Sequence, residues 1–211
     1  MDSCFWIDKR VLITGHTGFK GSWLALFLQK LGARVAGFSL PPTSSKDLFL
    51  GLNLDQSIDH RIGDIRDVDK MNEVIAQVKP QIVFHLAAQP LVRKSYFEPV
   101  ETWSTNVMGT INILEALRKV DDPCCLIAIT TDKVYKNNNW LHGYRENDAL
   151  GGHDPYSSSK AAAEIAIDSW RLSFTGSQPH QTPHLSIGVV RSGNVIGGGD
   201  WSDDRIIPDL V

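Results

Sequence analysis

Cysteine is scarce in this chain, and its positions exclude two kinds of structural framework. The three cysteines are Cys4, Cys124 and Cys125. An odd number with an adjacent pair does not build a disulfide framework, and this spacing fits no zinc motif. We therefore expect no bound metal, and we expect the protein to work in a reducing compartment such as the cytoplasm.

An excess of charge of one sign is also lacking. The 211 residues carry 21 lysines and arginines against 24 aspartates and glutamates, a formal net charge of -3. This balance argues against a nucleic-acid partner and against a basic membrane-binding patch. No apolar run reaches the roughly 18 residues that a transmembrane helix needs. The first ten residues lack the apolar core of a signal peptide, since Asp2 and Asp8 interrupt them.

Short β-branched runs alternate with longer helical patterns along the chain. Strands are predicted at residues 11–13, 34–38, 58–62, 82–86, 126–129 and 187–190, and helices at 19–31, 67–79, 100–117 and 154–174. Asp154 and Pro155 suit the N-cap and first position of the last helix. The alternation predicts an α/β fold, a doubly wound parallel sheet with helices on both faces. Its ligand cleft should lie beyond the C-terminal strand ends, where the winding reverses.

A glycine-rich loop joins the first predicted strand to the first predicted helix. Gly15, Gly18 and Gly21 follow each other at three-residue intervals. The first glycine permits a tight turn, the second lets a pyrophosphate approach the backbone, and the third lets the helix pack closely on the sheet. We predict that residues 1–211 form one dinucleotide-binding Rossmann domain; the alternative is a purely structural turn. The candidate cofactor ligands here are Gly15, Thr17, Gly18, Phe19, Lys20 and Gly21.

The residues themselves leave the choice between NAD and NADP open. An acidic residue at the end of the second strand would bind the adenosine ribose of NAD. The predicted strand ends instead at Phe38 and Ser39. Lys20, inside the glycine loop, is a candidate partner for the 2′-phosphate of NADP.

Two side chains suited to hydride-transfer chemistry lie one turn apart in the last predicted helix. Tyr156 and Lys160 are four residues apart and therefore share a face. A free tyrosine, with a pKa of about 10, is a poor base at neutral pH, but a nearby ammonium favours the tyrosinate. Thr131 follows the fifth predicted strand, a position that faces the expected cleft. These three residues are the first catalytic candidates.

Taken together, these features resemble the extended branch of the short-chain dehydrogenase/reductase superfamily, and within it the nucleotide-sugar 4,6-dehydratases. The G-x-x-G-x-x-G spacing is typical of that superfamily. Asp132-Lys133 stands where most of these dehydratases carry an Asp-Glu acid–base pair, and an Asp-Lys pair is similar to the branch that acts on CDP-glucose. Residues 85–93, 104–110 and 191–201 match that branch as well, so the resemblance covers nearly the whole chain.

The resemblance implies an NAD-dependent lyase that converts CDP-glucose into CDP-4-dehydro-6-deoxyglucose and water by internal hydride transfer. Thr131 would hold the sugar hydroxyl, and Tyr156, beside Lys160, would take the proton of the 4-hydroxyl. Asp132 would be the acid for the departing 6-hydroxyl, and Lys133 the base at C5. Further cofactor contacts implied are Ser39, Asp64, Ile65, Leu86, Ala87, Ala88 and Asn106; implied substrate contacts are Gln89, Asn194, Trp201 and Arg205.

The resemblance also has implications for assembly. Members commonly form homodimers through the helix that contains Tyr156 and the helix that contains Trp103. They continue into a smaller C-terminal part that closes over the sugar nucleotide. We expect most of that substrate-binding part to lie outside these 211 residues.

Several alternatives remain at this stage. Asp132 and Lys133 could form a simple ion pair, and Asn106 could be structural or part of a proton relay. His85 is expected to satisfy its polar atoms within the sheet. There are two rival functions. One is another nucleotide-sugar epimerase or reductase, and Asp132-Lys133 argues against it. The other is a non-catalytic cofactor-binding sensor, and the retention of Tyr156 and Lys160 argues against that.

Overall fold

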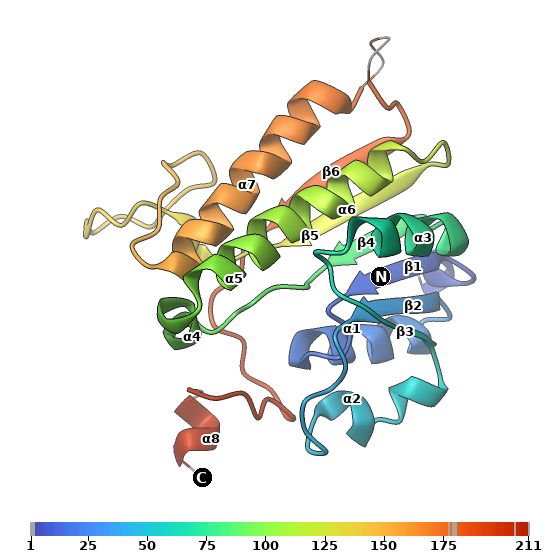
Figure 1. Cartoon of the computed structure of the whole chain (residues 1–211), viewed down its shortest axis with the longest axis horizontal. Helices are drawn as coiled ribbons and strands as arrows, with labels where there is room; N and C mark the ends of the chain where they lie inside the picture. Colours follow the sequence, from blue (N-terminus) through green and yellow to red (C-terminus); the bar gives the residue numbers. More distant parts are fainter. Residues whose placement is uncertain (1–2, 177, 179–180, 205, 211) are drawn as a thin grey trace.

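A single six-stranded parallel sheet forms the centre of the molecule (Figure 1). The computed structural model describes residues 3–176, 178, 181–204 and 206–210. The strand order is β3-β2-β1-β4-β5-β6. Their bounds are β1 Arg10–Thr14, β2 Arg34–Ser39, β3 Asp59–Ile62, β4 Ile82–His85, β5 Cys124–Ile129 and β6 Leu185–Val190. This order confirms the predicted doubly wound sheet, with the winding reversed between β1 and β4.

Helices cover both faces of this sheet, and the apolar strand runs are explained by that double coverage. Figure 1 shows α6 and α7 on one face and α1 and α2 on the other. Leu12 packs into the first core with Ile113 and Ile167, whereas its neighbours Val11 and Ile13 pack into the second. The helices are α1 Phe19–Lys30, α2 Leu48–Gly51, α3 Val68–Val78, α4 Val92–Phe97, α5 Pro99–Trp103, α6 Gly109–Arg118, α7 Pro155–Phe174 and α8 Ile206–Leu210.

The start of α7 follows the predicted capping chemistry. The Asp154 carboxylate accepts a hydrogen bond from the Ser157 backbone N–H at 2.9 Å, and the Ser157 hydroxyl pairs with the Asp154 backbone in return. Pro155 occupies the first turn, where its missing N–H costs nothing. This reciprocal cap fixes where the helix begins, one residue before Tyr156.

The helix predicted over residues 100–117 differs from expectation in its interior. A π-helical segment, Ser104–Met108, separates α5 from α6 within one continuous helical path. In this segment the Asn106 carbonyl accepts a bond from the Thr110 hydroxyl at 2.7 Å. Apolar spacing could not show this, since steps of three and four residues fit both helix types. The tail, which showed no strong pattern, contains the short helix α8.

In the part of the chain that the structure describes, none of the helices has both the length and the hydropathy needed to cross a bilayer.

Candidate active site

Two adjoining cavities open at the C-terminal ends of the strands, at the point where the winding reverses. The first has a volume of about 290 Å³ and is bounded by the ends of β1, β2, β3 and β4. The second, about 370 Å³, reaches from the glycine loop to the ends of β5 and β6 and to α7. Gly15, Leu86, Ala88 and Pro90 line both cavities, so together they form one elongated cleft.

The glycine loop between β1 and α1 needs glycine at two positions, because a side chain there would collide with neighbouring backbone. Gly15 has a φ of +76°, and a Cβ there would lie 2.7 Å from the Ala87 nitrogen. A Cβ on Gly21 would lie 2.1 Å from the Gly15 carbonyl oxygen. These contacts pack the loop closely against the segment after β4 and against the start of α1, and α1 begins at Phe19 without a side-chain cap on its first N–H groups. Such N–H groups at a helix start suit a dinucleotide pyrophosphate.

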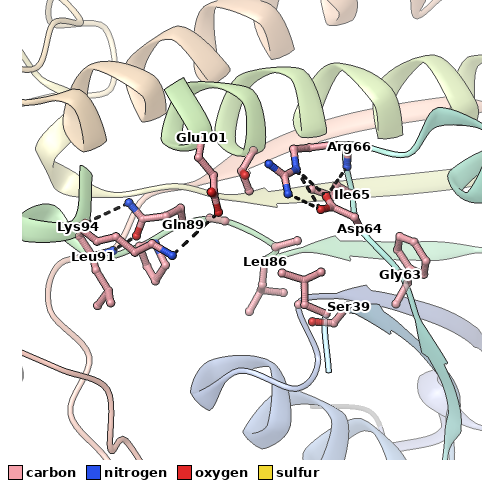
Figure 2. Close-up of a pocket in the computed structure, with 17 residues that line it drawn as sticks. Ser39, Gly63, Asp64, Ile65, Arg66, Leu86, Gln89, Leu91, Lys94 and Glu101 are labelled. Atoms are coloured by element: carbon pink, nitrogen blue, oxygen red, sulfur yellow. Dashed lines mark hydrogen bonds and ion pairs between the residues drawn. The ribbon is translucent and has the colours of Figure 1, made fainter. Parts of the chain in front are cut away.

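The first cavity contains most of the predicted adenosine contacts. Ser39, Asp64, Ile65 and the segment 86–88 all line it. Figure 2 shows the Asp64 carboxylate turned toward Arg66, whose guanidinium donates to it at 2.6–3.0 Å. This hydrogen bonding lowers the pKa of Asp64 below its ordinary value. Asp64 is thus a carboxylate held in a fixed orientation at the cavity wall.

The end of β2 and the glycine loop are joined by hydroxyl contacts. The Thr17 hydroxyl pairs with that of Ser39 at 2.8 Å and donates to the Leu40 carbonyl at 3.0 Å. Lys20 lines the second cavity, while Ser39 lines the first. The proposed pairing of Lys20 with a 2′-phosphate at the end of β2 therefore gains no support, because the ammonium belongs to the other part of the cleft.

The second cavity brings three of the five predicted catalytic residues together; Asp132 and Lys160 do not line it. Thr131, Lys133 and Tyr156 line it, with Lys20 and Asn194. Thr131 and Lys133 come from the turn after β5, and Tyr156 comes from the first turn of α7. Residues 25 positions apart in sequence thus face one space beside the glycine loop.

Lys160 is buried inside the protein and does not line this cavity. Its ammonium donates to the Ile129 carbonyl at 3.0 Å, and the residue is only 7% exposed. Burial and, to a smaller extent, the positive charge of Lys20 lower the pKa of Lys160, the negative charge of Glu164 raises it, and the net value is about 8. The group is therefore mostly an ammonium at neutral pH, in a position to favour a tyrosinate at Tyr156.

Asp132 and Lys133 form the ion pair that the sequence left open. Lys133 Nζ lies 3.1 Å from Asp132 Oδ1 and donates to Asn194 Oδ1 at 3.1 Å. The Lys133 side chain is 43% exposed and the Asp132 side chain is 55% exposed. An acid–base role needs a neutral lysine and a protonated aspartate, and this partly exposed ion pair is a different arrangement. The chemistry would need water to be excluded from this part of the cleft.

Gln89 and Asn106 are buried, and their side-chain amides form hydrogen bonds with other groups of the protein. The Gln89 amide bonds to the Leu91 backbone and to the Thr102 hydroxyl. Asn106 accepts from the Gln89 N–H at 2.8 Å and donates to Ser159 at 2.9 Å. The Gln89 side chain thus holds the loop after β4, and the residue also lines the first cavity; its predicted contact with substrate stays a prediction. Asn106 acts as a structural link between this loop and α7, and it does not line either cavity.

His85 behaves as predicted for a buried polar residue. Its ring bonds to the Thr14 hydroxyl at 2.7 Å and to the Thr110 hydroxyl at 3.0 Å. Burial, with a smaller contribution from Lys160, lowers the pKa of His85 to about 3. The ring is neutral and already partnered, which makes it part of the scaffold.

The remaining substrate candidates lie in the segment after β6. Asn194 lines the second cavity and also a third, apolar cavity with Trp201. Trp201 is 55% exposed. Arg205 lies outside the described residues. The sequence analysis did not identify Arg66, although its position two residues after the candidate Asp64 could have indicated it. It also did not identify Glu164, an acidic residue one turn after Lys160 on a buried helix face.

The fold and this cleft define a class of protein, the dinucleotide-binding Rossmann domains with a threonine and a tyrosine at the cavity beside the glycine loop and a buried lysine one turn further along the same helix. A family model described as GDP-mannose 4,6 dehydratase matches residues 12–177. The chain belongs to this family.

Relatives and solved structures agree with this membership. The chain is 50% identical over 211 residues to a CDP-glucose 4,6-dehydratase from Salmonella typhimurium (strain LT2), covering 100% of this chain and 59% of that relative. It is 28% identical to a dTDP-D-glucose 4,6-dehydratase from Dictyostelium discoideum, covering 96% of this chain and 47% of the relative. The structure of MoeE5 in complex with UDP-glucose and NAD matches with a TM-score of 0.74 at 26% identity, over 95% of this chain and 59% of that one. The chain thus spans about half to three fifths of these proteins.

Proposed function

We propose that this chain is the cofactor-binding and catalytic part of an NAD-dependent nucleotide-sugar 4,6-dehydratase, with CDP-glucose as substrate. The observation that carries the proposal is the gathering of Thr131, Lys133 and Tyr156 in one cavity beside the glycine loop. The 50% identity to a CDP-glucose 4,6-dehydratase supports the dehydratase reaction and the cytidine nucleotide. The NAD in the related MoeE5 complex supports the cofactor.

The first half of the proposed reaction depends on α7 and on the turn after β5. Bound NAD supplies the acceptor for hydride from C4 of the sugar and later the donor of hydride to C6. Tyr156, held as a tyrosinate by the buried Lys160 ammonium, takes the proton of the 4-hydroxyl and becomes a neutral phenol. Thr131 holds that hydroxyl beside the phenol.

The second half of the reaction removes water across C5 and C6. A ketone at C4 acidifies the C5 proton, which Lys133 takes, and Asp132 protonates the departing 6-hydroxyl. Each group must change its charge for this, so the ion pair at 3.1 Å has to open or be desolvated when the sugar binds. The sum is loss of water with no net redox change.

The product mass tests the proposed function. The longest form of the protein is incubated with NAD and, in parallel, with CDP-glucose, UDP-glucose, dTDP-glucose and GDP-mannose. We expect a product lighter by one water from CDP-glucose, detected by mass spectrometry. An epimerase would give a product of unchanged mass, and a cofactor-binding sensor would give none; either outcome contradicts the dehydratase proposal.

We also propose a homodimer formed through α4, α5 and α7. Phe97 is 83% exposed, Val100 80% and Ile165 61%, and these elements lie together in Figure 1. Such exposure of large apolar side chains on neighbouring helices is typical of a partner interface. The double change Val100→Glu and Ile165→Glu is expected to convert dimers to monomers in sedimentation velocity, with Ile62→Glu at the exposed β3 edge as the control. A wild-type protein that sediments as a monomer contradicts the proposal.

A further inference from the structure

One carboxylate inside the protein contacts both strand ends that border the catalytic cavity. Glu164 lies on α7, one turn after Lys160, and is 4% exposed. Its Oε1 accepts a hydrogen bond from the Thr130 hydroxyl at 2.5 Å. Its two oxygens also accept from Arg191, at 3.0 Å from Nε and at 2.5 Å from Nη2. Both acceptor atoms are thus used by groups from other elements.

These contacts act on the segments that hold the catalytic candidates. Thr130 directly precedes Thr131 at the end of β5, and Arg191 directly precedes the segment 192–195 that lines the second cavity. The two segments are also joined to each other. The Asp132 N–H donates to the Ser192 carbonyl at 3.0 Å. Glu164 therefore connects the helix of Tyr156 to both strand ends at once.

The guanidinium of Arg191 extends this connection to the outer side of the site. Its Nη1 donates to the Glu146 carbonyl at 3.1 Å, and its Cζ lies 4.7 Å from the centre of the Tyr135 ring. The side chains of Arg191 and Glu164 are 18% and 5% exposed. A charge pair this buried adds little net stability. It does fix the relative positions of the two side chains, because displacement of either partner leaves an unpaired charge inside the protein.

We propose that Glu164 is a positioning residue for the 4,6-dehydratase reaction: held by Thr130 and Arg191, it sets where Thr131 and Lys133 lie relative to Tyr156. The inference rests on the proposed function and deepens it. Glu164 does not line the catalytic cavity, so it acts through the residues that it holds.

Glu164 also belongs to the charges around Lys160, and this gives a readout that a purely structural role would not move. Those groups are Lys20 from the start of α1, the neutral His85 on β4, Glu164 on α7 and its partner Arg191 after β6. The negative charge of Glu164 raises the pKa of Lys160 and so opposes burial. Without that charge, the pKa of Lys160 falls below about 8, and its ammonium is lost at a lower pH.

The main variant is Glu164→Gln, which keeps the volume and removes the charge. We expect kcat for water loss to fall on the order of 10²-fold, as for a small misplacement of catalytic groups. We expect the alkaline limb of the kcat–pH profile to move to lower pH, because the tyrosinate loses its cationic partner earlier. The dissociation constant for NAD should remain unchanged, since the adenosine cavity is elsewhere.

Two further variants separate positioning from general damage. Arg191→Lys keeps the positive charge but loses the two-pronged contact, so kcat should fall while the alkaline limb stays in place. Glu115→Gln, which breaks the partly exposed pair with Arg118 on α6, is the matched control and should leave both unchanged. If Glu164→Gln does not fold, Arg191→Lys decides: an unchanged kcat in that variant overturns the proposal.

A substrate-free measurement distinguishes this inference from the proposed function. Ultraviolet titration of tyrosinate, with the Tyr156→Phe spectrum subtracted, reports the phenol directly. In Glu164→Gln the Tyr156 phenol should ionise at higher pH than in the wild type. A shifted titration without any water-loss product means that the proposed function fails, while the influence of Glu164 on Lys160 and Tyr156 stands. An unshifted titration together with an unshifted kcat–pH profile overturns the inference.

Discussion

Replacing Tyr156 by phenylalanine is expected to lower kcat for water loss by about 10²–10⁴-fold, the usual contribution of a general acid–base group. The change corresponds to roughly 3–5 kcal/mol of transition-state stabilisation. The phenyl ring keeps the shape of the side chain at the start of α7 but has no oxygen to accept the proton of the sugar 4-hydroxyl. The measurement is kcat by product mass, with the NAD dissociation constant determined in parallel.

Cofactor binding should survive this change, because the adenosine cavity at the ends of β2 and β3 does not include Tyr156. The control is Tyr96→Phe, since Tyr96 is 64% exposed on α4. A Tyr156→Phe protein that retains the wild-type rate would show that the phenol is not the base. Loss of NAD affinity in that variant, with the rate limited only by occupancy, would assign Tyr156 to binding instead of catalysis.

Replacing Lys133 by methionine is expected to separate the two halves of the reaction. Water loss should fall by about 10²–10⁴-fold, because no other group is proposed to take the C5 proton. Oxidation at C4 should continue, because Tyr156 and Lys160 are intact. The enzyme should therefore accumulate its cofactor in the reduced form, which absorbance reports, while mass spectrometry shows little dehydrated sugar.

The elimination rate of this variant decides between the acid–base interpretation and the simple ion pair, provided that its stability is unchanged. An ion pair as exposed as Asp132–Lys133 contributes about 0–1 kcal/mol, so Lys133→Met should melt close to the wild type. Lys136→Met, three residues further along the exposed segment, is the matched control. Elimination at the wild-type rate in Lys133→Met would show that Lys133 is not the base and that the pair has only a structural role.

Much of the fold could be predicted from the sequence because local chemistry and tertiary packing agree there. The run 11–13 is apolar at every position since both sheet faces are covered, and it forms β1. Asp154 and Ser157 cap α7 through contacts only three residues apart. Gly21 is specified by the backbone of its own loop, which approaches it closely, whereas at Gly15 the approaching backbone belongs to the distant segment after β4. The cap of α7 and the place of Gly21 need few distant partners.

The sequence by itself determined the alternation of strands and helices, the glycine loop and the residue types able to move a proton. Only the tertiary structure decided how those residues are used. It turned Gln89 inward to the Thr102 hydroxyl, brought Asn194 to the Lys133 ammonium, and joined Glu164 to Arg191 across 27 positions of chain. The physical reason is range: apolar periodicity and backbone caps depend on neighbours within a turn or two, whereas a buried polar group takes whichever partner the packing of distant elements presents.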